Sequence, residues 1–139
     1  MVRINLVDPR TLSDQHLIAE YNEILMLRGY ILRHPLLTTR ISNYRLGKGH
    51  ILFFKDKVLY LKKRHQLLKE EMKRRSFHPI KFFLLVGIPK KLWKDWKPTQ
   101  KEIKIIKQRI LQRVKEKPLF YRYYGKQRGL IYFKKLLAR

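Results

Sequence analysis

Residues 14–33 read DQHLIAEYNEILMLRGYILR, and their hydrophobic pattern decides the fold class. Apolar side chains recur along this stretch at helical spacing, namely Leu17, Ile18, Tyr21, Ile24, Leu25 and Ile31 or Leu32. Thr11 or Ser13 can act as the N-cap before the first turn, and Pro35 requires the helix to end near residue 33. The stretch therefore predicts an amphipathic helix whose apolar side packs in a core.

Another face of the same helix carries ionisable side chains. At about 100° per residue, His16, Glu20 and Glu23 fall within roughly 60° of one another. We expect this face to present its ionisable groups outside the core. An isolated helical glutamate is more often a solvated surface residue, so the face alone does not establish a site.

Two further helices are predicted downstream. The second runs from about Phe54 to Arg75, and its apolar positions are Phe54, Val58, Leu61, Leu68 and Met72. Cations crowd the remaining surface of this helix, namely Lys62, Lys63, Arg64, Lys69, Lys73, Arg74 and Arg75. The third helix begins at a capping box formed by Thr99 and Glu102 and ends before Pro118.

Irregular segments are expected around these helices. Residues 2–12 are expected to form an extended arm, residues 34–52 a loop, and residues 82–86 either a short strand or a buried irregular segment. The chain contains no internal repeat and no low-complexity linker. We therefore predict one compact all-α domain over residues 1–139, with three main helices and with residues 127–139 as a C-terminal extension.

The charge of the chain points to a polyanionic partner. Among 139 residues, 34 Lys and Arg stand against 10 Asp and Glu, which gives a formal net charge of +24. Such a surface repels itself unless a polyanion or counterions neutralise it. The alternative is a soluble protein with many solvated lysines, but such a surface usually balances its lysines with glutamates. We therefore favour nucleic acid as the partner class.

Composition also excludes several kinds of chemistry. The chain has no cysteine, which rules out disulfides, thiolate chemistry and Cys-based zinc sites. The histidines at positions 34, 50, 65 and 78 lack ligand-like spacing with acids, so we expect neither a metal site nor a cofactor. No apolar run is long enough to cross a bilayer. We expect an intracellular monomer without a membrane partner.

The first residues of the chain offer a nucleophile. Val2 is small, so removal of Met1 would expose the α-amine of Val2. The reference pKa of an α-amine is about 7.7–8.0, against about 10.4 for lysine, so this amine is substantially neutral near pH 7. Amines form Schiff bases with carbonyl-type carbons.

A series of short motifs extends over nearly the whole chain. They are VRINL at 2–6, DQHL at 14–17, AEY at 19–21 with Glu23, GKGH at 47–50, FF at 53–54 with DK at 56–57, KR at 63–64, IP at 88–89, Asp95, Pro98, Ile103, Arg109, Pro118 and YRYYGK at 121–126. In this order and spacing the chain resembles the pyrimidine-dimer DNA glycosylases of the phage endonuclease V type. About the last dozen residues have no counterpart in the resemblance.

The resemblance implies a DNA repair enzyme. It implies a glycosylase with coupled AP lyase activity on cyclobutane pyrimidine dimers in double-stranded DNA, with Val2 and Glu23 as the catalytic pair. The Val2 amine would attack the sugar, the Glu23 carboxylate would assist, and β-elimination from the Schiff base would cut the strand. The enzyme would kink the duplex, flip out the base opposite the lesion and scan undamaged DNA non-specifically.

The resemblance also marks candidate DNA-binding residues. They are Arg3, Gln15, His16, Asn22, Arg109, Arg113, Tyr121, Tyr123, Tyr124 and Lys126. Each has a plainer interpretation, since His16 can be only a capping or surface residue, the arginines can be solvated and the tyrosines can belong to the core. Asn22 and Met26 depart from the family pattern, which has arginines near the glutamate.

A second function class stays open from the charge alone. A non-catalytic nucleic-acid-binding protein, such as a chromatin- or ribosome-associated factor, would need the same cations. It would be indifferent to the Val2 amine and to Glu23. Covalent trapping on damaged DNA separates the two classes.

Overall fold

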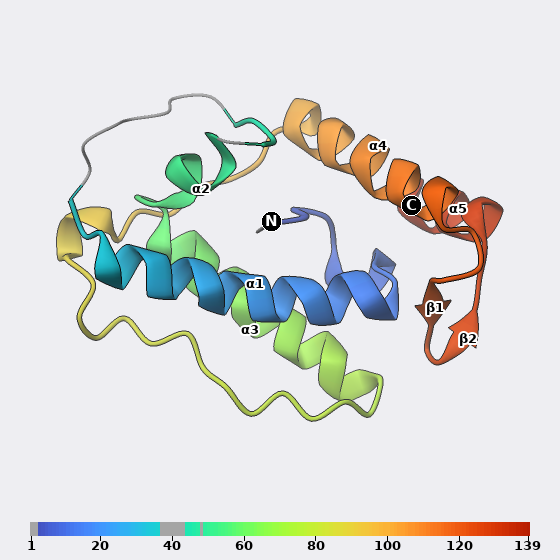
Figure 1. Ribbon diagram of the computed structural model, residues 1–139, viewed down its shortest axis with the longest axis horizontal. Coiled ribbons are helices and arrows are strands. Elements are labelled where there is room, and N and C mark those ends of the chain that lie inside the picture. Colours follow the sequence, from blue (N-terminus) through green and yellow to red (C-terminus); the bar gives the residue numbers. More distant parts are fainter. Residues whose placement is uncertain (1–2, 37–43, 48) are drawn as a thin grey trace.

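The computed structural model describes residues 3–36, 44–47 and 49–139, and this part of the chain is mostly helical (Figure 1). Its helices are α1 (Asp14–Arg33), α2 (Gly49–Phe54), α3 (Val58–Arg74), α4 (Gln100–Glu116) and α5 (Leu130–Leu137). It also contains the 3₁₀ turns η1 (Pro9–Thr11) and η2 (Lys90–Leu92) and the antiparallel strands β1 (Arg122–Tyr123) and β2 (Lys126–Gln127). The predicted all-α class is confirmed.

Helix α1 forms one wall of the core, as its pattern predicts. Ser13 is the N-cap, and its Oγ accepts a hydrogen bond of 3.0 Å from the His16 N–H. The buried stripe consists of Leu17, Tyr21, Ile24, Leu27 and Ile31. Ile18 is 37% exposed, which corrects its predicted place in this stripe.

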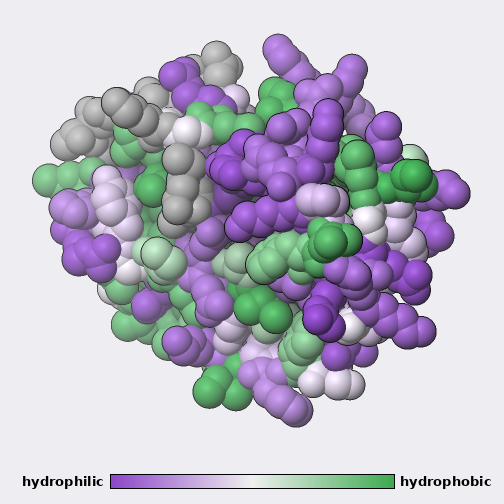
Figure 2. Space-filling model, turned by 45° about the vertical axis from the view of Figure 1, so that its right-hand side comes forward, coloured by the Kyte–Doolittle hydropathy of each residue, from purple (hydrophilic) through white to green (hydrophobic). Residues whose placement is uncertain are grey.

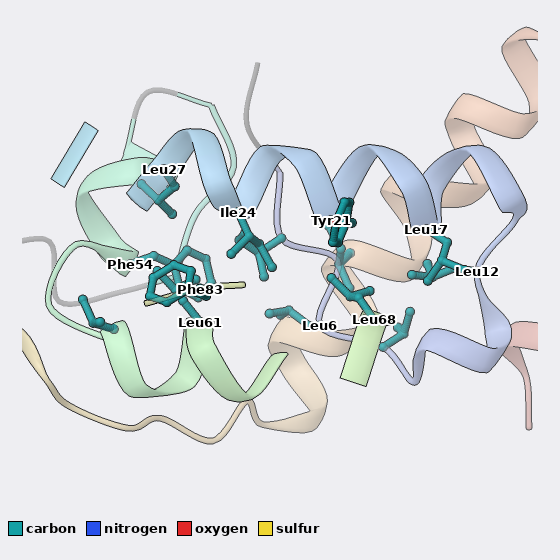
Figure 3. Packing of buried hydrophobic residues seen from close by; sticks show 14 of the residues in the cluster. Leu6, Leu12, Leu17, Tyr21, Ile24, Leu27, Phe54, Leu61, Leu68 and Phe83 are labelled. Atoms are coloured by element: carbon teal, nitrogen blue, oxygen red, sulfur yellow. The ribbon is translucent and has the colours of Figure 1, made fainter. Parts of the chain in front are cut away.

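Helix α3 packs against α1, and the main core lies between them (Figure 3). Leu61 and Leu68 of α3 point toward α1. Arg64, Lys69 and Arg75 are buried, which corrects the prediction that they lie on a solvated surface. Two of them are buried because acids meet them: Arg64 pairs with Glu20 of α1, and Arg75 pairs with Glu71 and with Asp14 of α1.

Residues 49–54 form helix α2, which corrects the predicted loop and the predicted start of the next helix at Phe54. Phe54 ends α2, and α3 begins only at Val58. Both phenylalanines of α2 are buried against Trp96, at ring distances of 5.1 and 5.6 Å. This aromatic packing joins distant segments, so local spacing does not reveal it. Part of the predicted loop, residues 37–43, lies outside the described residues.

Residues 77–88 run along α1 and α3 without regular structure, so the short strand predicted for 82–86 is wrong, and the alternative of a buried irregular segment holds for its irregularity but not for its burial. Phe83 is buried, whereas Phe82, Leu84 and Val86 are 65%, 55% and 80% exposed. The Lys81 N–H donates a 2.9 Å hydrogen bond to the Tyr21 hydroxyl, which fixes the segment to α1.

The C-terminal third adds a second small core. Helix α4 begins at the predicted capping box, where the Thr99 N–H donates to the Glu102 carboxylate at 3.1 Å. Between β1 and β2, Tyr124 and Gly125 both have positive φ, 52° and 80°, as a two-residue hairpin turn requires. Helix α5 of the C-terminal extension packs Phe133 and Leu136 near Val114 and Tyr121. No helix in the described part of the chain is long and apolar enough to cross a membrane.

Candidate nucleic-acid interface

A cleft of about 300 Å³ lies between the N-terminal arm, α1 and α4. Its lining residues are Arg3, Asn5, His16, Ala19, Glu23, Arg109, Ile110, Arg113, Glu116, Lys117 and Tyr121. Four of these side chains are cationic and two are carboxylates, so the cleft has an excess of positive charge. The surface turned forward in Figure 2 is largely hydrophilic, with separate hydrophobic patches.

Glu23 belongs to α1 and lines the cleft. The Arg3 N–H donates a 3.0 Å hydrogen bond to Glu23 Oε2. Burial raises the pKa of the Glu23 carboxyl, and the Arg3 N–H partly opposes that effect. A carboxyl with a raised pKa can accept and release a proton more readily near neutral pH.

The arm is held in place by a buried histidine. The Ile4 N–H donates to His50 Nε2 at 2.9 Å, and His50 Nδ1 lies 3.1 Å from the Arg45 carbonyl oxygen. Burial lowers the pKa of His50 to about 4, so the ring is neutral at pH 7. Nε2 must then be the acceptor, and Nδ1 carries the hydrogen that reaches Arg45. Sequence reasoning did not single out His50, although it ends the GKGH motif.

A strained turn follows in the arm. Leu6 has φ = 57°, and the Val7 N–H donates to the Asn5 carbonyl oxygen at 2.5 Å across it. A non-glycine residue with positive φ is strained, and the surrounding packing must offset the free-energy cost of this conformation. Leu6 and Val7 are buried in the main core, and Asn5 faces the cleft. Core packing thus fixes the arm beside Glu23.

His16 and Gln15 together position Tyr121 at the cleft. The rings of His16 and Tyr121 are stacked, with centroids 4.7 Å apart and planes 10° from parallel. Gln15 lies outside the cleft lining; its Nε2 donates to the Phe120 carbonyl oxygen at 3.0 Å, and its Oε1 accepts from the Arg122 N–H at 2.9 Å. Burial, with Arg113 and Arg3 nearby, lowers the pKa of His16 to about 4. His16 is therefore a neutral ring beside the cations.

Two arginines of α4 face the arm across the cleft. Arg109 Nε is buried and has no hydrogen-bond acceptor among the described residues, and Arg113 forms a 3.3 Å ion pair with Glu116. The pKa of Arg3 is lowered by burial and then by the charges of Arg109 and Arg113. Three guanidinium groups are thus held close enough to repel one another. An anion in the cleft would relieve that repulsion.

The remaining candidates lie elsewhere. Asn22 is exposed and does not line the cleft, and Lys126 is exposed on β2. Tyr123 and Tyr124 flank the Arg75 guanidinium, at 4.6 and 4.8 Å from their ring centroids. The hydroxyls of Tyr123 and Tyr124 donate to the Arg10 carbonyl oxygen and to Glu71. Val2 lies outside the described residues.

The fold and the cleft define a small, strongly basic helical protein whose cleft places the Glu23 carboxyl, hydrogen-bonded by the N-terminal arm, among cations, a class suited to chemistry on nucleic acid. The family model for pyrimidine dimer DNA glycosylase matches residues 1–84, which is more than half of the chain. The chain belongs to this family. It is therefore a DNA repair glycosylase, and its partner is DNA that contains pyrimidine dimers.

The matched residues cover only one wall of the cleft. The arm and α1 lie within residues 1–84, whereas α4 and Tyr121 lie beyond them. The family match therefore supports a functional role for the wall that carries Glu23. The role of the wall that carries Arg109 and Arg113 is supported only by the geometry of the cleft.

Proposed function

We propose that the chain is a bifunctional DNA N-glycosylase and AP lyase acting on cyclobutane pyrimidine dimers in double-stranded DNA. The nucleophile is the α-amine of Val2 after removal of Met1, and Glu23 is the assisting carboxyl. The covalent intermediate is a Schiff base between this amine and the sugar, and β-elimination from it cuts the strand.

One contact carries the proposal, the hydrogen bond from the Arg3 N–H to Glu23 Oε2 at 3.0 Å. The α-nitrogen of residue 2 is three covalent bonds from the Arg3 nitrogen, a span of at most about 4 Å. Glu23 therefore accepts from the peptide N–H of the residue that directly follows the proposed nucleophile. A sugar carbon bonded to that amine would lie within reach of the same carboxyl.

The bonds that form and break follow from this arrangement. The nitrogen lone pair of Val2 bonds to C1′ of the sugar as the C1′–N bond to the base breaks, and the base leaves with that electron pair and takes up a proton. The Glu23 carboxylate stabilises the cationic character of C1′. Ring opening gives the imine. Loss of a C2′ proton, taken up by Glu23, then breaks the C3′–O bond, and the phosphate leaves with that electron pair as the 5′ end of the downstream strand.

The cations of the cleft would hold the DNA backbone. Arg3, Arg109 and Arg113 converge from the arm and α4, and guanidinium groups bind phosphate with two parallel hydrogen bonds. His16 and Tyr121 offer a stacked aromatic wall beside them, suited to a base or sugar turned out of the helix. Asn22 and Met26 add no charge next to Glu23, so the phosphate contacts would come from Arg3 of the arm and from the arginines of α4.

Borohydride reduction during incubation with dimer-containing duplex tests the proposal. We expect a covalent protein–DNA adduct that is lost when the α-amine is blocked and strongly reduced in Glu23→Gln. Glu70→Gln is the matched control, because Glu70 is an exposed glutamate on α3, outside the cleft lining. Mass measurement of the trapped N-terminal peptide should place the adduct on Val2.

Two results would contradict the proposal. Equal trapping by the amine-blocked protein would assign the nucleophile to another group. Tight binding of damaged DNA without any adduct or strand cleavage would instead fit a protein that binds nucleic acid without chemistry.

A further inference from the structure

A second pocket, of about 640 Å³, lies between α3 and the irregular segment 77–88. Its walls are mostly apolar, with Leu59, Leu67 and Phe82 among them. Three lysines also line it, Lys62, Lys63 and Lys69, and the described lining contains no carboxylate. Lys63 is paired with Asp95 at 2.5 Å, so the pocket combines an apolar surface with two lysines, Lys62 and Lys69, that have no carboxylate partner among the described residues.

Lys69 is the unusual member of this group. It is 2% exposed, and its Nζ lies 3.3 Å from the centroid of the Phe82 ring. No described acceptor or carboxylate meets its ammonium group, which makes it unlike the buried arginines of α3. Burial and the charge of Lys73 both lower the pKa of Lys69. The residue is thus buried mainly through its alkyl chain, whereas its ammonium group reaches the pocket, where the Phe82 ring is its one described contact and an anion could serve as its counter-charge.

Phe82 provides the complementary surface. One face of its ring is covered by Lys69, yet the residue is 65% exposed, so most of the remaining ring faces solvent. Leu67, on the same pocket, is 49% exposed. A flat apolar surface beside cations fits a ligand that has a planar body and an anionic group. An unpaired nucleotide has both, whereas duplex DNA hides its base faces by stacking.

The pocket lies on the side of α1 away from the cleft. Tyr21 faces the pocket side, since its ring stacks on His65 at 4.8 Å and its hydroxyl accepts from the Lys81 N–H. Glu23 is two residues further along the helix, which turns it about 200° from Tyr21. DNA bound straight across the cleft would therefore leave this pocket open.

We propose that the pocket between α3 and residues 77–88 binds an unpaired nucleotide of single-stranded DNA. The base stacks on Phe82, and the phosphate supplies the counter-charge that Lys69 lacks, with Lys62 beside it. The site does not depend on the Val2 chemistry, because it lies on another face and uses other residues. It lets the protein hold an unpaired strand while a duplex occupies the cleft.

Photo-crosslinking of a short oligothymidylate that contains 5-iodouracil tests the site in the unaltered protein. We expect the crosslinked peptide to contain Phe82. In solution, Phe82→Ala and Lys69→Met should each weaken binding of the same oligonucleotide about tenfold, the loss expected for one stacked base or one desolvated charge contact. The matched controls are Ile131→Ala and Lys91→Met, which remove an exposed apolar residue and an exposed lysine elsewhere.

Cleavage of dimer-containing duplex by Phe82→Ala and Lys69→Met should equal that of the unaltered protein, so loss of this site is distinguishable from failure of the proposed chemistry. Circular dichroism checks that both variants fold. Oligonucleotide affinities equal to those of the controls, or crosslinks confined to peptides of α4 and residues 120–126, would overturn the proposal. So would Phe82-dependent binding of an acidic leucine-rich peptide without any effect on the oligonucleotide, because that result assigns the pocket to a protein partner.

Discussion

Glu23 carries a conflict between its burial and its charge. The side chain is half-buried, and burial raises the pKa of its carboxyl, so the environment favours the protonated form. The proposed chemistry needs the ionised form when cationic character develops on the sugar. The proposed chemistry therefore requires at neutral pH a charge that burial in this fold disfavours.

We therefore predict that Glu23→Gln lowers cleavage activity without lowering the free energy of unfolding at pH 7. Cleavage of dimer-containing duplex should fall by roughly 10²–10⁴-fold, the usual contribution of a positioned acid or base. A carboxyl whose pKa is raised by folding stabilises the fold below its unfolded pKa and loses that contribution as pH rises through the folded pKa. At pH 7 the neutral amide should therefore make the protein as stable as the unaltered chain or more stable, while its oxygen still accepts from Arg3.

Urea unfolding at pH 7, run beside cleavage assays of the same samples, measures both quantities. Glu70→Gln, an exposed glutamate on α3, should change neither. A Glu23→Gln protein that is less stable than the unaltered chain at pH 7 would mean that the charge supports the fold.

Helices α1 and α3 are joined by charge as well as by apolar packing. Arg64 Nε and Nη2 donate to the two Glu20 carboxylate oxygens at 2.7 and 3.0 Å, and both side chains are almost fully buried. The spacing of His16, Glu20 and Glu23 suggested one exposed face, yet Glu20 is fully buried beside α3. Only Glu23 and His16 of that set reach the cleft.

Removing one partner of this pair should be costly. Arg64→Met leaves the Glu20 carboxylate buried without a counter-charge, and we expect the free energy of unfolding to fall by about 3–5 kcal/mol. The double variant Glu20→Met with Arg64→Met should recover most of that loss, because no buried charge then remains. Urea unfolding of the single and double variants measures the difference. A double variant as unstable as the single one would attribute the loss to the bond that Arg64 also makes to the Val7 carbonyl.

Local pattern predicted the elements better than it predicted their partners. The spacing of apolar residues located α1, α3 and α4, because each buries one stripe along a long helix. It missed α2, whose phenylalanines are buried by Trp96 from a distant segment. The family resemblance marked Glu23 and the arginines of α4, and the structure brings these into one cleft. It included His50 in the GKGH motif but assigned this residue no role, because the Ile4 N–H that His50 accepts from is 46 residues away in sequence.

The molecule as a whole combines a net charge of +24 with three histidines that burial keeps neutral at pH 7. Burial lowers the pKa of His16, His50 and His65 to about 4 each. In the unfolded chain these rings would take up protons near the ordinary value of about 6.5. A group whose pKa is lowered by folding stabilises the protein above the unfolded pKa and loses that contribution as pH falls through the folded pKa.

The free energy of unfolding should therefore fall between about pH 6.5 and 4.5, before the carboxylates with lowered pKa values begin to titrate. Each fully coupled histidine contributes a slope of about 1.4 kcal/mol per pH unit.

His65 is the best one to test, because it is 1% exposed, its Nε2 has no hydrogen-bond partner among the described residues, and its ring stacks on Tyr21. His65→Phe keeps an aromatic ring there and removes the titration. Urea unfolding at pH 7, 5.5 and 4.5 should show that the free energy of unfolding falls less steeply with pH in His65→Phe, by up to about 1.4 kcal/mol per pH unit. His78→Phe, which makes the same substitution at an exposed position, is the matched control. An equal slope in His65→Phe would mean that acid sensitivity arises from self-repulsion of the cationic surface, which added salt would screen.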